Sequence, residues 1–200
     1  RVLFRSEAIV GLDIGTSTVR AVIGIFTENG ELQITGVGKA PSNGLRNGVV
    51  VNIEEAADCV SAAIEAAEMM AGHEVLSVYT GIGGSQVSSM NSKGIVGVAG
   101  NDKGLQEITP RDIERVLEAA RAVPIDIARQ IIHVIPQTYT IDGQKGIKKP
   151  LNMLGVRLEA EVHIVTAAVT SIQNLIRCIK RAKFDVEDIR LKTLAAAEAI

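Results

Sequence analysis

The stretch from Ile9 to Gly24, IVGLDIGTSTVRAVIG, places two apolar runs on either side of a short polar turn. Each apolar run has the residue types of a buried β-strand, and the turn between them carries glycine, serine and threonine. A hairpin with such a tip presents backbone N–H groups and hydroxyls, which are the donors that an anion such as a phosphate requires. The sequence therefore predicts a phosphate-binding hairpin.

The candidate ligands are the residues of the tip and two charged neighbours. Asp13 ends the first strand, and a hydrated divalent cation would reconcile its carboxylate with a nearby phosphate. Arg20, on the second strand, either reaches back toward a phosphate or faces solvent. An ordinary hairpin with a polar tip is the alternative interpretation of the same residues. The predicted phosphate contacts are Gly15, Thr16, Ser17 and Thr18.

The composition limits the classes of function. Two hundred residues can bury a substantial core, and because the chain has no Trp that core is expected to consist of Ile, Val, Leu and Ala. A net charge of −2 and few aromatic residues argue against nucleic acid as a partner. Cys59 and Cys178 form no disulfide or metal-ligand pattern, which indicates a reducing, cytosolic setting. No apolar run reaches the length of a membrane span.

The order of the predicted elements indicates a lobe that is interrupted by an inserted segment. Three antiparallel strands over 8–38 lead to a helix that Asn52 caps, and a strand parallel to the first follows at 75–80. Glycines at 81–84 then precede a strand, a helix and two further strands. An amphipathic helix, a strand at 186–191 and an alanine-rich helix complete the chain.

These motifs resemble those of the actin, Hsp70 and sugar-kinase superfamily, and within it the FtsA family of bacterial cell-division proteins. The similarity runs from residue 8 to the last residue. Besides the stretch quoted above it is carried by PSNGLRNGVVVNIEEA at 41–56, VYTGIGG at 78–84 and LAAAEAI at 194–200. The resemblance implies a mixed α/β (α+β) fold: an RNase H-like, actin-type ATPase lobe with an inserted strand-helix-strand-strand (SHS2-like) subdomain.

The domain boundaries are expected from the same resemblance. Residues 8–84 and 163–200 would form the actin-like subdomain IA, and 85–162 the inserted subdomain 1C, while 1–7 would be an expression-derived or disordered tail. The chain is expected to be the N-terminal half of a longer protein. The second phosphate loop, the adenosine site and a C-terminal membrane-targeting helix would belong to the other half.

For the whole protein, the resemblance implies that ATP and Mg²⁺ bind, that the protein polymerises, and that it links the FtsZ ring to the cytoplasmic membrane. It would lie on the inner face of that membrane at the division septum and recruit later division proteins. The 200-residue chain, with half a cleft, is expected to bind ATP negligibly and to have no enzymatic activity. Lys192-Thr193 stands where superfamily members carry Glu or Gln near the attacking water, so efficient hydrolysis is not expected.

Self-association is expected to involve the inserted subdomain, which would contact the next subunit of a filament. A basic segment followed by apolar residues is the candidate contact surface. Its members are Lys145, Lys148, Lys149, Leu151, Met153 and Leu154.

Two alternative functions are compatible with parts of the sequence. The PilM scaffold of type IV pilus assembly shares the inserted module, but the segment at 41–55 favours the FtsA family. A metal-dependent nuclease or kinase on an RNase H-like fold is the second alternative. A nuclease needs several carboxylates on its strands, and the predicted core strands of the first lobe supply only Asp13. A kinase would place its substrate-orienting residues outside this chain.

Overall fold

The computed structural model describes residues 8–99 and 104–199 and divides the chain into two compact units. Unit 1 lies before residue 88 and after residue 167, and unit 2 comprises 88–167. These boundaries differ by a few residues from those expected at 84 and 162. The expected tail at 1–7 lies outside the described residues.

Unit 1 is built on a five-stranded sheet in the order β13-β6-β1-β2-β3. The first three strands of the chain pair antiparallel, whereas β6 pairs parallel with both β1 and β13. The predicted antiparallel pairing of the first three strands and the predicted parallel direction of β6 relative to β1 are confirmed. The strands are β1 (Ile9–Ile14), β2 (Thr18–Phe26), β3 (Leu32–Pro41), β6 (Ser77–Ile82) and β13 (Asp185–Leu191).

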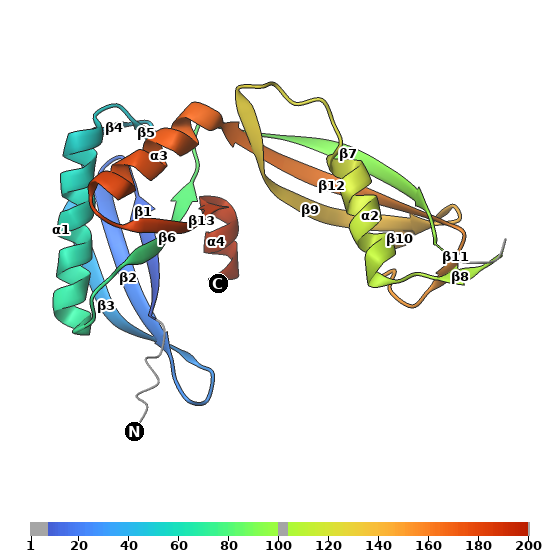
Figure 1. Cartoon of the computed structure of the whole chain (residues 1–200), viewed down its shortest axis with the longest axis horizontal. Helices are drawn as coiled ribbons and strands as arrows, with labels where there is room; N and C mark the ends of the chain where they lie inside the picture. The colour runs from blue at the N-terminus through green and yellow to red at the C-terminus, as the bar shows by residue number, and fades with distance from the viewer. Residues whose placement is uncertain (1–7, 100–103, 200) are drawn as a thin grey trace. The chain divides into compact units, whose positions relative to one another are not determined.

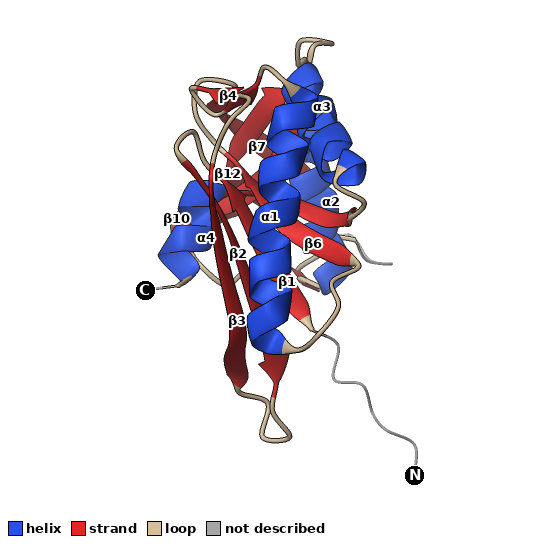
Figure 2. Ribbon diagram, turned by 90° about the vertical axis from the view of Figure 1, so that its left-hand side faces the viewer, coloured by secondary structure: helices blue, strands red, loops and turns tan. Residues whose placement is uncertain are grey.

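Helices cover both faces of this sheet (Figures 1 and 2). The helices α1 (Ile53–Ala71) and α3 (Val169–Arg181) pack on one face, where they share an aliphatic core with alternate residues of β1 and β2. The short α4 (Lys192–Glu198) lies on the other face, against β6 and β13. The helix begins at Lys192, two residues earlier than expected. The backbone of this lysine is therefore part of the first turn of α4.

The start of α1 is fixed by Asn52, as the sequence predicts. Its side-chain oxygen accepts hydrogen bonds from the N–H groups of Glu54 (3.1 Å) and Glu55 (3.3 Å). Gly72, with φ 67°, ends the helix. Between β3 and α1, the two-residue strands β4 (Leu45–Arg46) and β5 (Val49–Val50) form a small hairpin.

Two glycines of β3 let α1 approach the sheet very closely. A Cβ atom added at Gly38 would overlap the backbone of Ala63, and one added at Gly36 would overlap that of Ala67. The alanines of α1 and the glycines of β3 therefore form a backbone-to-backbone contact that larger residues cannot make.

Unit 2 contains a four-stranded sheet in the order β10-β9-β12-β7, with α2 (Pro110–Arg121) packed on it. The predicted strand, helix, strand, strand order is confirmed by β7, α2, β9 and β12. One correction concerns the basic segment at 145–149, which was expected to be a loop: its first residues belong to strand β10, which covers 144–147. The strands are β7 (Val87–Gly97), β9 (Arg129–Ile141), β10 (Gln144–Ile147) and β12 (Arg157–Ala168), with β8 (Gln106–Glu107) and β11 (Leu154–Gly155) as a separate pair.

The chain leaves and re-enters unit 1 at adjacent points. The N–H of Ala168 donates a hydrogen bond of 3.1 Å to the carbonyl oxygen of Gln86, so the two crossing segments are joined by their backbones. No helix in the two described stretches is long and apolar enough to cross a membrane.

The close contact of α1 with β3 predicts the effect of an added methyl group. Gly38→Ala should lower the free energy of unfolding by about 2 kcal/mol or more, because the helix must move away from the strand. Gly11→Ala is the matched control: nothing lies within 4 Å of a Cβ at that position, so its effect should stay within about 0.5 kcal/mol. Urea titration measures both, and equal stability of the two variants would contradict the contact.

Asp112, fully buried at the start of α2, predicts a pH dependence of unit 2. Burial alone would raise its pKa, but hydrogen bonds from the Thr109 hydroxyl and the N–H groups of Ala99 and Thr109, with the charge of Arg115, hold the pKa below its ordinary value. A lowered pKa in the folded state stabilises the fold above the unfolded-state pKa, and this contribution is lost as the pH falls through the folded-state value.

Asp112→Asn should therefore lower the free energy of unfolding by about 1–3 kcal/mol at pH 7. The difference from the wild type should shrink as the pH falls below 3.8, the ordinary value for this carboxyl. Glu114→Gln, at an exposed position of the same helix, is the control. A difference that stays constant between pH 7 and pH 3 would refute this role of the carboxylate.

Candidate functional site

The tip of the β1–β2 hairpin has the geometry of an anion site. The N–H of Gly15 donates to the carbonyl oxygen of Thr18 (3.0 Å), which closes the turn, and a Cβ at Gly15 would lie 2.8 Å from that oxygen. Among the described residues, the N–H groups of Thr16 and Ser17 and the Ser17 hydroxyl have no hydrogen-bond partner. Both residues are exposed, so these donors are available to a ligand.

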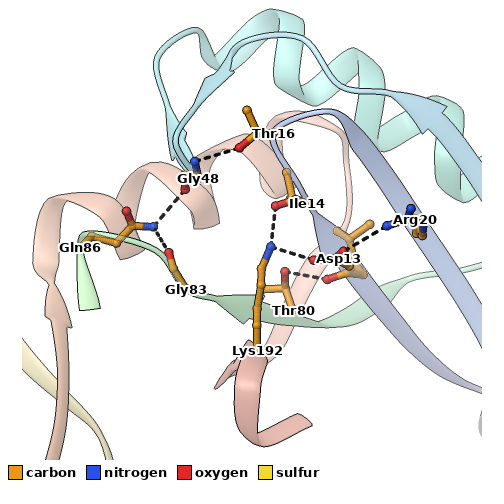
Figure 3. A network of polar contacts seen from close by, with 10 residues as sticks. Asp13, Ile14, Thr16, Arg20, Gly48, Thr80, Gly83, Gln86 and Lys192 are labelled. Carbon is orange, nitrogen blue, oxygen red and sulfur yellow. Dashed lines mark hydrogen bonds and ion pairs between the residues drawn. The ribbon is translucent and has the colours of Figure 1, made fainter. Parts of the chain in front are cut away.

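A second loop, not predicted from the sequence, is hydrogen-bonded to this tip (Figure 3). The N–H of Gly48 donates to the Thr16 hydroxyl oxygen (3.1 Å). The Gln86 amide donates to the carbonyl oxygens of Gly48 (3.0 Å) and Gly83 (2.6 Å). These bonds join the hairpin tip, the β4–β5 turn and the glycine segment after β6 into one network.

The signal for the second loop was present in the sequence. Asn47 and Gly48 both have positive φ angles, 52° and 77°, which is the conformation of a two-residue hairpin turn. Glycine adopts positive φ angles without steric cost, which suits position 48. The Asn-Gly pair itself identifies the hairpin.

Asp13 is held by two cations. Its Oδ1 lies 2.7 Å from the Lys192 ammonium, which also donates to the carbonyl oxygen of Ile14 at 2.7 Å. Its Oδ2 lies 3.8 Å from a guanidinium nitrogen of Arg20, the residue directly opposite it on β2. Arg20 thus pairs with Asp13 in this structure. Lys192, which the resemblance placed just before the last helix at the position of a Glu or Gln near the attacking water, is a site residue whose contact with Asp13 was not predicted.

The residues present fit a phosphate, but they do not fit Mg²⁺ at Asp13 as arranged. Mg²⁺ at nucleotide sites is held by one or two carboxylates, phosphates and water. Here both oxygens of the Asp13 carboxylate face positive side chains, and the described residues form no cluster of three or more potential metal ligands. A magnesium ion that bound the Asp13 carboxylate directly would have to displace Lys192, whereas the contact predicted from the sequence runs through water. The magnesium contact at this residue stays a prediction.

Lys192 also bears on hydrolysis. An ammonium group has three hydrogen-bond donors and no acceptor. It therefore cannot accept a hydrogen bond from an attacking water, as the Glu or Gln expected at this place in the superfamily can.

The candidate contact surface in unit 2 needs one correction. Leu151 and Leu154 are exposed, and Lys148 donates to the carbonyl oxygen of Gln137 (2.9 Å). Lys145 lies exposed on β10, and Lys149 is exposed as well. Met153 instead packs against the core of unit 2, because the N–H of Ile108 donates to its carbonyl oxygen (2.8 Å) and holds this segment against the β8–β11 pair.

Unit 2 contains two histidines on its strands, His133 on β9 and His163 on β12. Both are half-buried, and His163 makes a 2.7 Å hydrogen bond between its Nδ1 and the side-chain oxygen of Asn91. Residues on the open face of a sheet can still be covered by their neighbours on adjacent strands.

Comparison with known proteins agrees with both units. Residues 84–166 match the model of the SHS2 domain inserted in FtsA. A solved PilM-PilN type IV pilus biogenesis complex superposes on 96% of this chain and 50% of its own, with a TM-score of 0.60 and 16% sequence identity. At that identity the likeness shows the fold alone. The chain is thus an actin-type lobe of the RNase H-like kind that carries an inserted SHS2 domain.

Sequence relatives define the family. Cell division protein FtsA of Pseudomonas aeruginosa is 47% identical over 97% of this chain, and that of Borreliella burgdorferi is 46% identical over 96%. FtsA of Bacillus subtilis is 38% identical over 97%. The chain belongs to the FtsA family of cell-division proteins. It spans 45%, 46% and 43% of the lengths of these three relatives.

Proposed function

We propose that this chain supplies one side of a nucleotide site and an assembly module to an actin-like cell-division protein. The observation that carries the proposal is the closed hairpin tip with its unpartnered donors at Thr16 and Ser17, beside the ammonium of Lys192. Donors and positive charge at one edge of a sheet suit the phosphates of a nucleoside triphosphate, for which we propose ATP.

In the whole protein, we propose, a second lobe completes the cleft and holds the base and the ribose. Nucleotide binding then supports polymerisation, and the filament links the FtsZ ring to the cytoplasmic membrane and recruits later division proteins. Membership of the FtsA family and the half-site in unit 1 support this proposal. The 200-residue chain alone, with one side of the site, should bind ATP negligibly and should not hydrolyse it.

A negative charge at the hairpin tip tests the nucleotide site. In a full-length protein that includes this chain, Ser17→Asp should lower ATP affinity at least tenfold, because a carboxylate would lie where the phosphates bind. Asn29→Asp adds the same charge at the exposed tip of the β2–β3 hairpin and should leave affinity unchanged. Isothermal titration calorimetry measures both. Equal ATP affinity of the two variants would remove the hairpin tip from the site.

A charged substitution in unit 2 tests the assembly surface. Leu154 has an exposed fraction of 61%, so Leu154→Glu should leave the fold intact while it shortens or abolishes ATP-dependent filaments of the full-length protein. Met69→Glu, at an exposed position of α1, is the control and should polymerise normally. Electron microscopy gives filament length. Normal filaments from the Leu154 variant would exclude this residue from the interface.

A further inference from the structure

Lys192 stands out because its ammonium reaches the end of β1 from the opposite end of the chain. It contacts both the Asp13 carboxylate and the Ile14 carbonyl oxygen at 2.7 Å, directly before the hairpin tip begins (Figure 3). The side chain remains 33% exposed. The ammonium is therefore anchored by two acceptors while part of the side chain stays open to a ligand.

The strand beneath the lysine is shaped to admit it. A Cβ added at Gly81 would lie 2.6 Å from Cγ of Lys192, and one at Gly83 would lie 3.5 Å from its Cδ. Cγ is close to the backbone, so the lysine could not avoid a side chain at position 81 by rotating only its far end. The aliphatic part of the Lys192 side chain thus packs against Gly81 and Gly83 of the VYTGIGG segment, where no other side chain takes up the space.

The charges at this point favour an anion over a second cation. Asp13, Arg20 and Lys192 together carry a net charge of +1. A divalent cation beside Asp13 would be repelled by both basic groups, whereas a phosphate at the hairpin tip would be attracted by them. Lysine is a common phosphate ligand, acting as a compact point charge.

We propose that Lys192 supplies to the bound phosphates the positive charge that a magnesium ion at Asp13 was expected to supply, and that Asp13 is a positioning residue for this lysine. The inference rests on the proposed nucleotide site. It assigns the two residues different roles: Lys192 touches phosphate, and Asp13 holds the ammonium at the end of β1. Nucleotide binding by this protein should therefore need Mg²⁺ much less than it would with a neutral residue at position 192.

The first experiment uses the 200-residue chain and Mn²⁺ alone. Paramagnetic broadening of amide signals in nitrogen-15 NMR spectra reports where Mn²⁺ binds. In the wild type, the amides of residues 13–18 should show no preferential broadening, because Lys192 occupies the carboxylate. Lys192→Gln should bind Mn²⁺ at Asp13 at least tenfold more tightly. Lys192→Arg, which keeps the charge, and Lys180→Gln, at the exposed end of α3, should behave like the wild type.

The second experiment measures ATP affinity of the full-length protein by calorimetry, with excess Mg²⁺ and with EDTA. Wild-type affinity should change less than threefold between the two conditions. The affinity of Lys192→Gln should fall at least tenfold in EDTA and recover with Mg²⁺, while Lys180→Gln should follow the wild type. If the glutamine variant fails to fold, the wild type and Lys192→Arg still test the inference, because both should retain ATP binding in EDTA.

The outcomes separate this inference from the proposed function. If the wild type and Lys192→Gln bind ATP with the same dependence on Mg²⁺, or bind Mn²⁺ equally at Asp13, the role of Lys192 is wrong while the nucleotide site stands. If no variant binds ATP under either condition, the proposed function fails and the inference fails with it. A wild type that loses ATP affinity in EDTA as strongly as Lys192→Gln also overturns the inference.

Discussion

The backbone contact between α1 and β3 is the constraint on which the site depends. Because Gly38 has no side chain, the helix lies against the strand at Ala63, and this fixes the position of the first turn of α1. Asn52, at that turn, and Val51 both donate to the carbonyl oxygen of Gly44. The β4–β5 hairpin is thereby held where Gly48 meets Thr16. The packing of a helix on a sheet therefore sets the geometry of a surface loop.

Local patterns in the sequence were sufficient for most of the fold. The apolar runs of β1 and β2 and the cap at Asn52 each depend on residues close together in the chain, and each predicted its element. The β4–β5 hairpin, the β8–β11 pair and β10 were missed. Asn47-Gly48 joins β4 to β5, and Asp142-Gly143 directly precedes β10; all four residues have positive φ angles, as two-residue hairpin turns require. These two pairs are the sequence signals for the β4–β5 hairpin and for β10.

The candidate site was predicted only in part, for a different reason. The hairpin tip is local, so the residues from Gly15 to Thr18 could be chosen from their spacing alone. The partners of Asp13 depend on tertiary structure. Strand β6 separates β13 from β1 in the sheet, and Lys192, directly after β13, reaches past β6 to the end of β1. A lysine in place of an acidic or amide residue was visible in the sequence as a departure from the superfamily pattern. Its contact with Asp13 required the fold.

The bond between Ala168 and Gln86 has a consequence for how such proteins evolve. An insertion whose two ends emerge side by side resembles a lengthened surface turn, because the host lobe needs no new path for its chain. Gain, loss or exchange of a whole module at this point would leave the host sheet and its loops undisturbed. Evolution can therefore replace the inserted module while it retains the lobe. One host lobe can in this way carry different inserted domains, and every intermediate still folds.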